Sequence, residues 1–229
     1  MTRQLVWLFD LDNTLHDAGH AIFPAINRNM NALIARVLES ESKPAHGEAV
    51  NAVRIAYWQR YGATLLGMMR HHAVRSDDFL REAHEFADLS QMIRAERGVA
   101  YLLRRLPGLK ILLTNAPAAY SREVVRHLGL HKHFADHVPI ESMVVHRHLR
   151  PKPSPWLMRR LLASRGLSAR RCVLVEDSLE NLKTAKMLGL RTVWLTGYTK
   201  GTRRRPAFVD VKVNSLSQLA RQRRMLGSA

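Results

Sequence analysis

Several short apolar runs, each ending in a cluster of polar residues, limit the folds open to this chain. Each run has the length of a strand, and near-continuous apolarity fits a strand buried on both faces of a sheet. Residues with helical periodicity lie between the runs, and this alternation predicts an α/β fold with helices on both faces of a parallel sheet. The predicted strands are Val6–Phe9, Lys110–Leu113, Cys172–Val175 and Arg191–Leu195.

Capping residues mark two of the intervening helices. Ser154 followed by Pro155 is typical of a helix start, and Gly166 lies just beyond the last apolar residue at helical spacing. A second helix is predicted from Leu179 to Leu188, where Gly189 ends it.

Residues 17–93 break the alternation, because they contain no strand pattern. Apolar residues from Ile22 to Val37 share one helical face, Ser40–Gly47 reads as a loop, and further helices are predicted at about 48–61, 63–72 and 77–87. We therefore predict two domains. Residues 1–16 and 94–229 form the α/β core, and 17–93 form a small all-helical domain inserted after the first strand.

The chain is strongly basic, with 36 Lys and Arg against 19 Asp and Glu and a formal net charge of +17. Such a field attracts nucleic acid, anionic lipid or small anions such as phosphate esters. The densest basic runs, Arg203–Arg205 and Arg221–Arg224, lack interleaved aromatic residues, which argues against a platform for stacking single strands. No helix-turn-helix or zinc-finger pattern is present either. Nucleic acid is therefore not the expected partner.

The single cysteine, Cys172, excludes a disulfide framework and fits a reducing compartment. It lies in a predicted strand, so we expect a buried structural thiol. No apolar stretch is long enough to span a bilayer, and the first apolar run is too short for a signal peptide. We expect a cytoplasmic protein with no membrane partner. The sequence does not indicate an oligomeric state.

Polar residues collect at the carboxyl ends of the predicted strands, where ligands bind in open α/β sheets. An unpaired buried carboxylate is costly, so acidic residues that converge there need a partner. A hard cation such as Mg²⁺ would neutralise them with oxygen ligands. The residues at these ends are Asp10, Asp12, Thr114, Asn115, Glu176 and Asp177.

Carboxylates around Mg²⁺ suit phosphoryl transfer, because the metal offsets charge on the substrate oxygens and a carboxylate can attack phosphorus to give an aspartyl-phosphate. The phosphate also needs donors, which the Thr114 hydroxyl, the Asn115 amide and backbone N–H groups would supply. Lys152 is the candidate for a fixed cation. Prolines on both sides restrict the backbone around it.

The segments "FDLDNT", "LLTNA", "KPSP" and "VEDSLEN" together resemble the four motifs of the haloacid dehalogenase-like phosphohydrolases, in the same order. The resemblance implies a Rossmann-like core, Mg²⁺ dependence and a covalent aspartyl-phosphate. It also implies roles by position. Asp10 resembles the nucleophile and Asp12 the general acid/base. Thr114, Asn115 and Lys152 correspond to the phosphate-binding positions, and the implied metal ligands are Asp10, the Asp12 backbone carbonyl, Asp177 and Glu176, with Asn181 orienting the loop.

Asp12 distinguishes two branches of this family. A phosphatase needs a group that protonates the departing ester oxygen and then activates water, whereas a dehalogenase has no leaving alcohol and carries no acid at this position. Asp12 therefore favours a phosphatase.

The inserted helical domain carries a second resemblance. "LDNTLHDAGHAIFPAINRNM" and "YWQRYGATLLGMMRHH" look like the pyrimidine 5′-nucleotidase branch, which has a helical cap (subfamily I). The implied substrate is a pyrimidine nucleoside 5′-monophosphate such as UMP or CMP, with Tyr57, Tyr61 and Met68 facing the base or sugar. Ordinary packing within the cap explains these three residues equally well. The alternative functions are phosphatase activity on a sugar phosphate or phosphoglycolate, and nucleic-acid binding on the same fold.

The histidines do not indicate a transition-metal site. The close pairs His71-His72, His131-Lys132-His133 and His146-Arg147-His148 lack the four-residue spacing with an intervening Glu that marks a catalytic zinc helix. His16 and His20 follow the first motif, where they either touch substrate or line a hinge.

Overall fold

The computed structural model describes residues 4–199 and 204–222, so Arg203 and the pair Arg223-Arg224 of the basic runs lie outside the described residues. The chain divides into two compact units: the residues up to Gly19 together with those from Ile93 onward, and His20–Met92. These divisions lie close to the domain boundaries predicted at residues 17 and 93. Within the described residues, every helix is too short or too polar to span a bilayer.

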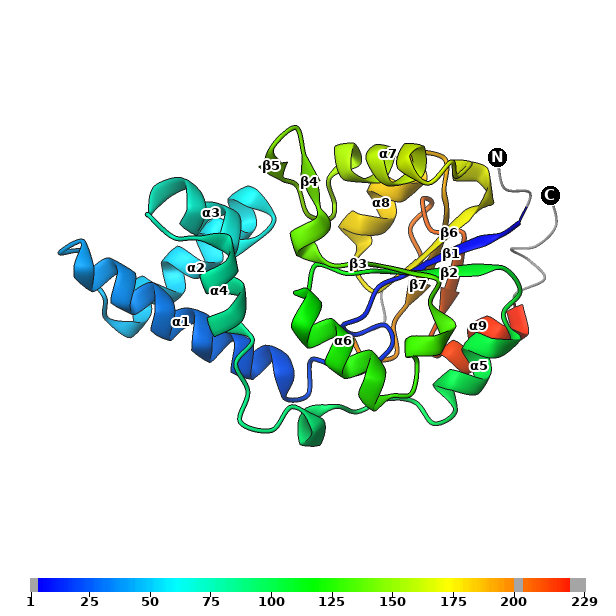
Figure 1. Ribbon diagram of the computed structural model, residues 1–229, viewed down its shortest axis with the longest axis horizontal. Helices are drawn as coiled ribbons and strands as arrows, with labels where there is room; N and C mark the ends of the chain where they lie inside the picture. Colours follow the sequence, from blue (N-terminus) through cyan, green and yellow to red (C-terminus); the bar gives the residue numbers. More distant parts are fainter. Residues whose placement is uncertain (1–3, 200–203, 223–229) are drawn as a thin grey trace. The chain divides into compact units, whose positions relative to one another are not determined.

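The first unit is built on a six-stranded parallel sheet with the strand order β3-β2-β1-β6-β7-β8 (Figure 1). β1 (Val6–Phe9) is completely buried and pairs on one side with β2 (Leu109–Leu113) and on the other with β6 (Cys172–Glu176). β7 (Arg191–Leu195) continues the sheet. All of the predicted strands are therefore present, and the predicted α/β fold with a Rossmann-like parallel sheet is confirmed.

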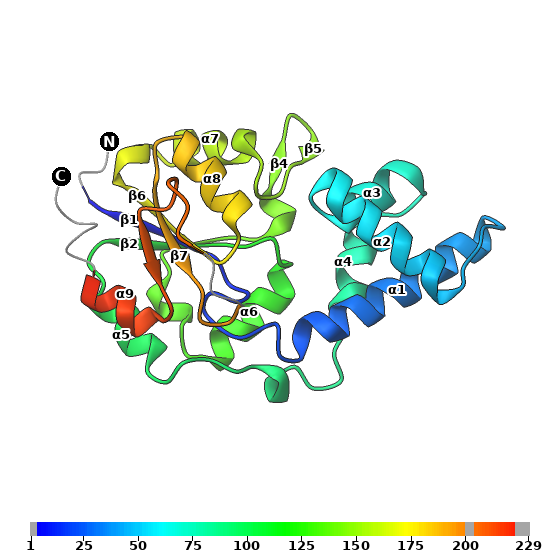
Figure 2. The ribbon, with the colours of Figure 1, turned by 180° about the vertical axis from the view of Figure 1, so that it is seen from behind.

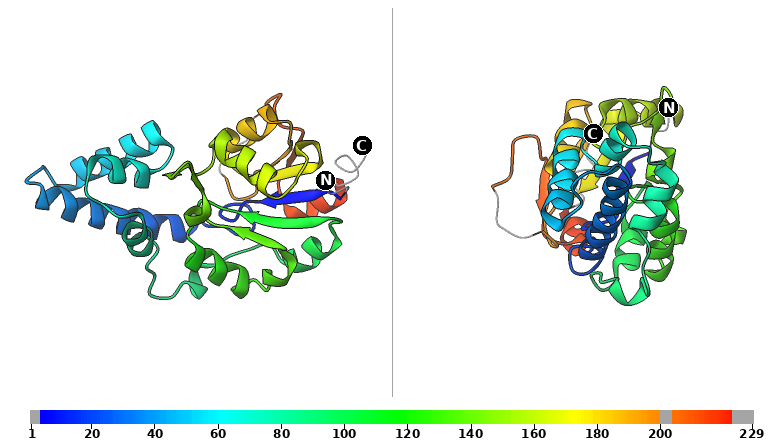
Figure 3. Two further views of the ribbon diagram at one scale, coloured as in Figure 1. Left: turned by 45° about the horizontal axis from the view of Figure 1, so that its top comes forward. Right: turned by 90° about the vertical axis from the view of Figure 1, so that its left-hand side faces the viewer.

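Helices cover both faces of this sheet. α7 (Pro155–Ser164) and α8 (Leu179–Met187) lie on one face (Figure 2). The opposite face carries α5 (Val99–Arg105), α6 (Ala118–His127) and α9 (Leu216–Gln222). Figure 3 (left) shows the strands between these two layers. The layers bury a core of aliphatic side chains, including Leu8, Ile111 and Leu174 of the sheet and Leu161 and Leu182 of α7 and α8.

The capping signals hold in the structure. The Ser154 hydroxyl accepts a hydrogen bond from the Leu157 N–H, Pro155 occupies the first turn of α7, and Gly166 follows the helix with φ +60°. Cys172 is fully buried in β6, as predicted, and burial raises the pKa of its thiol to about 11.

Two short strands and a hairpin were not predicted. β3 (Asp136–Val138) and β8 (Val211–Val213) form the edges of the sheet, and β4 (Val144–Val145) pairs with β5 (His148–Leu149) in an antiparallel hairpin. The remaining elements of this unit are short 3₁₀ turns at His131–His133, Ile140–Ser142 and Ala169–Arg171.

The second unit is helical throughout, as predicted for this segment. Its elements are α1 (Ile22–Ser40), α2 (Gly47–Tyr61), α3 (Thr64–His71), α4 (Ser76–Ala83) and a 3₁₀ turn at Ser90–Met92. α4 ends earlier than the predicted residue 87. The Asn29 side chain of α1 donates to the carbonyls of Ala83 and Glu85, which satisfies these backbone groups without further helix.

Candidate active site

Three carboxylates converge at the carboxyl edge of the sheet. Asp10 directly follows β1, and its N–H donates to the Val175 carbonyl of β6 at 3.0 Å, which extends the ladder to this point. Glu176 is the last residue of β6, and Asp177 follows it. One oxygen from each of Asp10, Glu176 and Asp177 lies within 4.8 Å of the others. This cluster of oxygen donors could hold a hard cation.

Lys152 lies buried against this cluster, with only 3% of its surface exposed. Its Nζ donates to Asp10 Oδ1 at 2.7 Å and to Glu176 Oε2 at 2.8 Å. The structure thus brings together the cationic and acidic residues that the sequence singled out from three separate motifs. Charge pairing explains how these groups tolerate burial.

The pKa values of these carboxylates and of Lys152 are shifted, because the groups are buried close together. Burial and the neighbouring Glu176 raise the pKa of Asp10 to about 7, although Lys152 opposes the shift. Burial and repulsion from Asp10 raise the pKa of Asp177 to about 6. Burial also raises the pKa of Glu176. For Lys152, burial favours the neutral amine, but Asp10 and Glu176 outweigh it and raise its pKa. The lysine therefore stays charged, and it does not relieve all of the repulsion among the carboxylates.

Asn115 fixes the backbone of the lysine. Its Oδ1 accepts from the Lys152 N–H at 2.9 Å, and its Nδ2 donates to the Lys152 carbonyl at 3.0 Å. The amide that the sequence suggested as a phosphate donor is therefore engaged in positioning Lys152.

Thr114 directly follows β2 at the same edge of the sheet and is buried. Its Oγ1 accepts from the Ala116 N–H at 3.1 Å, and this bond does not use the hydroxyl hydrogen.

Asp12 has a different environment from Asp10. Its Oδ1 accepts a hydrogen bond from the Tyr120 hydroxyl at 2.6 Å and lies 2.9 Å from His16 Nε2. Tyr120 and His16 are themselves buried and lie 3.3 Å apart at the hydroxyl and Nε2. His16 is thus a hydrogen-bond partner of Asp12, a role that differs from the two expected from the sequence, contact with substrate and lining of a hinge. Tyr120 has no signal in the local sequence, because α6 brings it to Asp12 from 108 positions away.

Two asparagines support the acidic loop. Asn181 in the first turn of α8 forms a side-chain hydrogen bond with Glu176. Asn13 bonds to the Asp177 side chain and adopts φ +57°, a left-handed conformation that asparagine tolerates better than most residues. Asn181 was predicted to orient this loop, whereas Asn13 was not singled out although it lies inside the first motif.

The aromatic residues of the helical unit make contacts within that unit. Tyr57 OH lies 2.9 Å from His72 Nε2, and Tyr61 OH lies 2.5 Å from His71 Nε2. The side chain of Tyr57 packs on Gly67, where a Cβ would lie only 2.2 Å from the ring. Met68 is completely buried. Packing therefore accounts for the position of Met68.

The structure places a carboxylate cluster and a buried lysine at the carboxyl edge of a Rossmann-like sheet. A helical unit follows the first strand of this sheet in the sequence. This combination is typical of a class of hydrolases. The chain belongs to the haloacid dehalogenase-like hydrolases, the family that matches residues 6–189. The family resemblance seen in the four motifs is confirmed.

Relatives within this family carry different names. The chain is 29% identical over 206 residues to a phosphoglycolate phosphatase of Yersinia pestis, covering 84% of this chain and 82% of the relative. It is 28% identical over 200 residues to a 5′-nucleotidase of Pseudomonas aeruginosa, covering 85% and 83% of the two chains.

Solved structures share the fold at lower identity. A phosphatase of this family from Thermococcus onnurineus matches with a TM-score of 0.64 and 17% identity over 98% of both chains. The L-2-haloacid dehalogenase of Xanthobacter autotrophicus matches with a TM-score of 0.61 and 17% identity, covering 99% of this chain and 100% of the other.

Proposed function

We propose that this hydrolase is a Mg²⁺-dependent phosphomonoesterase that works through an aspartyl-phosphate on Asp10. The observation that carries this proposal is the contact of Lys152 Nζ with both Asp10 and Glu176 beside Asp177. A buried cation and a cluster of carboxylate oxygens at one point provide binding for phosphate oxygens next to a carboxylate nucleophile.

The donor set fits Mg²⁺, because it consists of oxygen atoms and carries repulsion that a cation would relieve. Asp10, Asp177 and the Asp12 backbone carbonyl would hold the ion, with Glu176 ligating directly or through water. When bound, the ion supplies charge stabilisation for the phosphoryl oxygens.

The first half of the reaction forms an acyl phosphate, a mixed anhydride, on Asp10. An Asp10 carboxylate oxygen attacks phosphorus while Lys152 and Thr114 bind the non-bridging oxygens. The bond from phosphorus to the substrate oxygen breaks, and Asp12 gives its proton to the departing alcohol.

In the second half, Asp12 accepts a proton from water. The resulting hydroxide attacks phosphorus, and the bond to Asp10 breaks to release inorganic phosphate. Tyr120 and His16 hold the Asp12 carboxylate, and Asn115 holds Lys152.

The proposed substrate is a pyrimidine nucleoside 5′-monophosphate, and the proposed location is the cytoplasm, which suits the reduced thiol of Cys172. The resemblance of the two cap segments supports the pyrimidine nucleotide, and the name of the Pseudomonas aeruginosa relative, a 5′-nucleotidase, supports a nucleoside 5′-monophosphate. We assign substrate selection to the helical unit, with Tyr57 and Tyr61 as its candidate contacts and Met68 left out because it is buried. A second candidate is phosphoglycolate, which the name of the Yersinia pestis relative favours.

The test is Mg²⁺-dependent phosphate release from UMP, CMP, dUMP, AMP, GMP, glucose 6-phosphate and phosphoglycolate. Asp10→Asn removes the nucleophile, so we expect turnover to fall by a factor of about 10³ or more. Asp78→Asn is the matched control, because Asp78 lies on α4 and pairs with Arg81.

Preference for UMP and CMP, lost in Asp10→Asn and kept in Asp78→Asn, supports both mechanism and substrate. Preference for phosphoglycolate keeps the mechanism and rejects the nucleotide. Wild-type turnover in Asp10→Asn contradicts the mechanism. Salt-dependent retardation of nucleic acid, with no phosphate released from any ester, supports the alternative of a binding protein on this fold.

A further inference from the structure

The β4–β5 hairpin and α7 enclose a surface groove of about 670 Å³ within the first unit. Its lining includes Val144, His146, Arg147, Trp156, Arg159 and Arg160. We call it the Trp156 groove. The proposed phosphatase mechanism uses none of these residues.

Trp156 is the apolar centre of the groove and has 51% of its surface exposed. The His146 ring meets the indole edge-on, with ring centroids 6.3 Å apart, and the Arg159 guanidinium lies over the indole ring at 5.7 Å from its centroid. A large aromatic side chain that stays in water offers a flat surface on which another planar group can stack.

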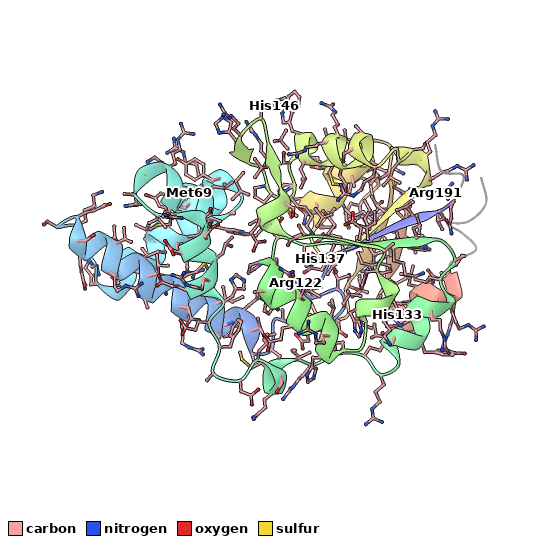
Figure 4. All side chains as sticks on the ribbon, in the orientation of Figure 1. Met69, Arg122, His133, His137, His146 and Arg191 are labelled. Carbon is pink, nitrogen blue, oxygen red and sulfur yellow. The ribbon has the colours of Figure 1, made fainter. Side chains whose placement is uncertain are left out.

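The turn of the hairpin presents further polar groups beside the indole. His146 and Arg147 form its two-residue loop and both have positive φ, 50° and 66°. This left-handed pair is the geometry that glycine and asparagine usually supply, so the sequence accepts backbone strain to place these side chains here. Figure 4 shows His146 at the tip of the hairpin, pointing away from the sheet.

The charge of the groove has one sign. Arg147, Arg159 and Arg160 line it, and its lining contains no acidic residue. Among the residues that the structure describes, no carboxylate forms an ion pair with any of these three arginines. Their guanidinium groups are therefore available to an anionic ligand, in a chain whose net charge is +17.

We propose that the Trp156 groove binds single-stranded nucleic acid, with a base stacked on the indole and backbone phosphates on the arginines. The planar bases and anionic phosphates of a single strand alternate along its length. They match the exposed Trp156 ring among guanidinium groups, because an aromatic ring in a positively charged groove is the combination that binds single strands. An acidic peptide would satisfy the arginines but would leave the indole without a planar partner.

The test is fluorescence anisotropy of a labelled oligouridylate of about ten nucleotides, a length within the range that such grooves bind. The oligonucleotide has hydroxyl ends and the buffer contains EDTA, so that it is not a substrate of a phosphomonoesterase. The variants are Trp156→Ala and the double variant Arg159→Glu/Arg160→Glu. Their matched controls are Trp58→Ala, since Trp58 is 60% exposed, and Arg104→Glu/Arg105→Glu, which changes the net charge equally beside the exposed Tyr101.

We expect Trp156→Ala to weaken binding by about tenfold or more, as loss of one stacked base does. The Arg159/Arg160 variant weakens binding and lowers its salt dependence, and the two controls bind within about twofold of wild type. Phosphate release by each variant checks that it is folded.

Three results would overturn the proposal. Wild type that shows no saturable binding rejects it. Equal losses in test and control variants assign binding to overall charge. Displacement by polyglutamate as effective as by unlabelled oligouridylate, with no effect of Trp156→Ala, assigns the groove to an acidic protein.

Discussion

The Asp12 carboxylate is held by two buried side chains from different parts of the chain, Tyr120 and His16. Burial and the negative charge of Asp12 raise the pKa of Tyr120, so its hydroxyl remains a proton donor. A donor at 2.6 Å keeps the carboxylate in one orientation while Asp10 faces Lys152. The two aspartates of the first motif are thus separated into different environments, which is what different chemical roles require.

Tyr120→Phe tests this positioning role. The ring remains, but the hydroxyl donor is lost, so Asp12 samples other orientations and proton transfer slows. We expect kcat to fall by about tenfold with little change in KM, because general acid/base catalysis contributes about 10² or more and only part of it is lost. Tyr101→Phe on the exposed face of α5 is the control. An increase in KM at unchanged kcat would instead place Tyr120 in ground-state binding.

The burial of Cys172 leads to a second prediction about a single residue, the reactivity of its thiol. Its thiol is buried and burial raises its pKa to about 11, so at pH 8 the reactive thiolate is scarce and inaccessible. We expect Ellman's reagent to label the native protein slowly and the guanidinium-unfolded protein at once. The chain has one cysteine, so the reading is unambiguous. Rapid stoichiometric labelling of native protein would show that β6 opens readily.

At the scale of elements, the packing of α2 on α3 depends on Gly67. A Cβ at this position would lie 2.2 Å from the Tyr57 ring and 2.5 Å from Tyr57 Cβ. Because Cβ is bonded to the backbone, a rotation of the Tyr57 ring alone would not relieve this clash. Gly67→Ala therefore forces the helices apart, and we expect it to destabilise the protein by about 1–3 kcal/mol.

Gly47→Ala is the matched control, because Gly47 begins α2 and a Cβ there meets no atom within 4 Å. Alanine favours the helix over glycine by up to about 1 kcal/mol, so this variant should equal or exceed wild-type stability. Chemical denaturation of both variants measures the difference. Equal stability of the two would show that α2 and α3 adjust without cost.

The strands and the site residues also show how much of the structure could be predicted from the sequence. Val6–Phe9 and Arg191–Leu195 are predicted with their correct bounds. The first is a fully buried, continuous apolar run, and the second is buried from Thr192 to Leu195 and ends in three apolar residues. β3 and β8 were missed because each has three residues, too few for a pattern. The motif residues Asp10, Lys152 and Glu176 were singled out by type and position. Tyr120 and the Trp156 groove depend on contacts between distant segments, which no local pattern records.

At the scale of the whole molecule, a chain with net charge +17 carries a cluster of three carboxylates, of which Asp10 and Glu176 are buried and Asp177 is partly buried. The basic field favours anionic substrates near the site, and this attraction weakens as salt is added. The carboxylate cluster, in contrast, favours a cation. Its repulsion is only partly offset by Lys152, so the folded state without a cation contains unrelieved electrostatic energy that the unfolded chain lacks.

Mg²⁺ should therefore raise the melting temperature, because it binds the assembled cluster and not the unfolded chain. At a concentration of about 100 times Kd the gain is about 2.7 kcal/mol, or about 5–10 °C for a chain of this size. Asp177→Asn should abolish this shift and also raise the melting temperature without metal. The pKa of Asp177 is raised to about 6 in the folded protein, so at pH 7.5 its ionised form opposes folding and its removal relieves that cost. NaCl at matched ionic strength is the control in differential scanning calorimetry. An equal shift with NaCl, or an undiminished Mg²⁺ shift in Asp177→Asn, would place the ion's effect outside this cluster.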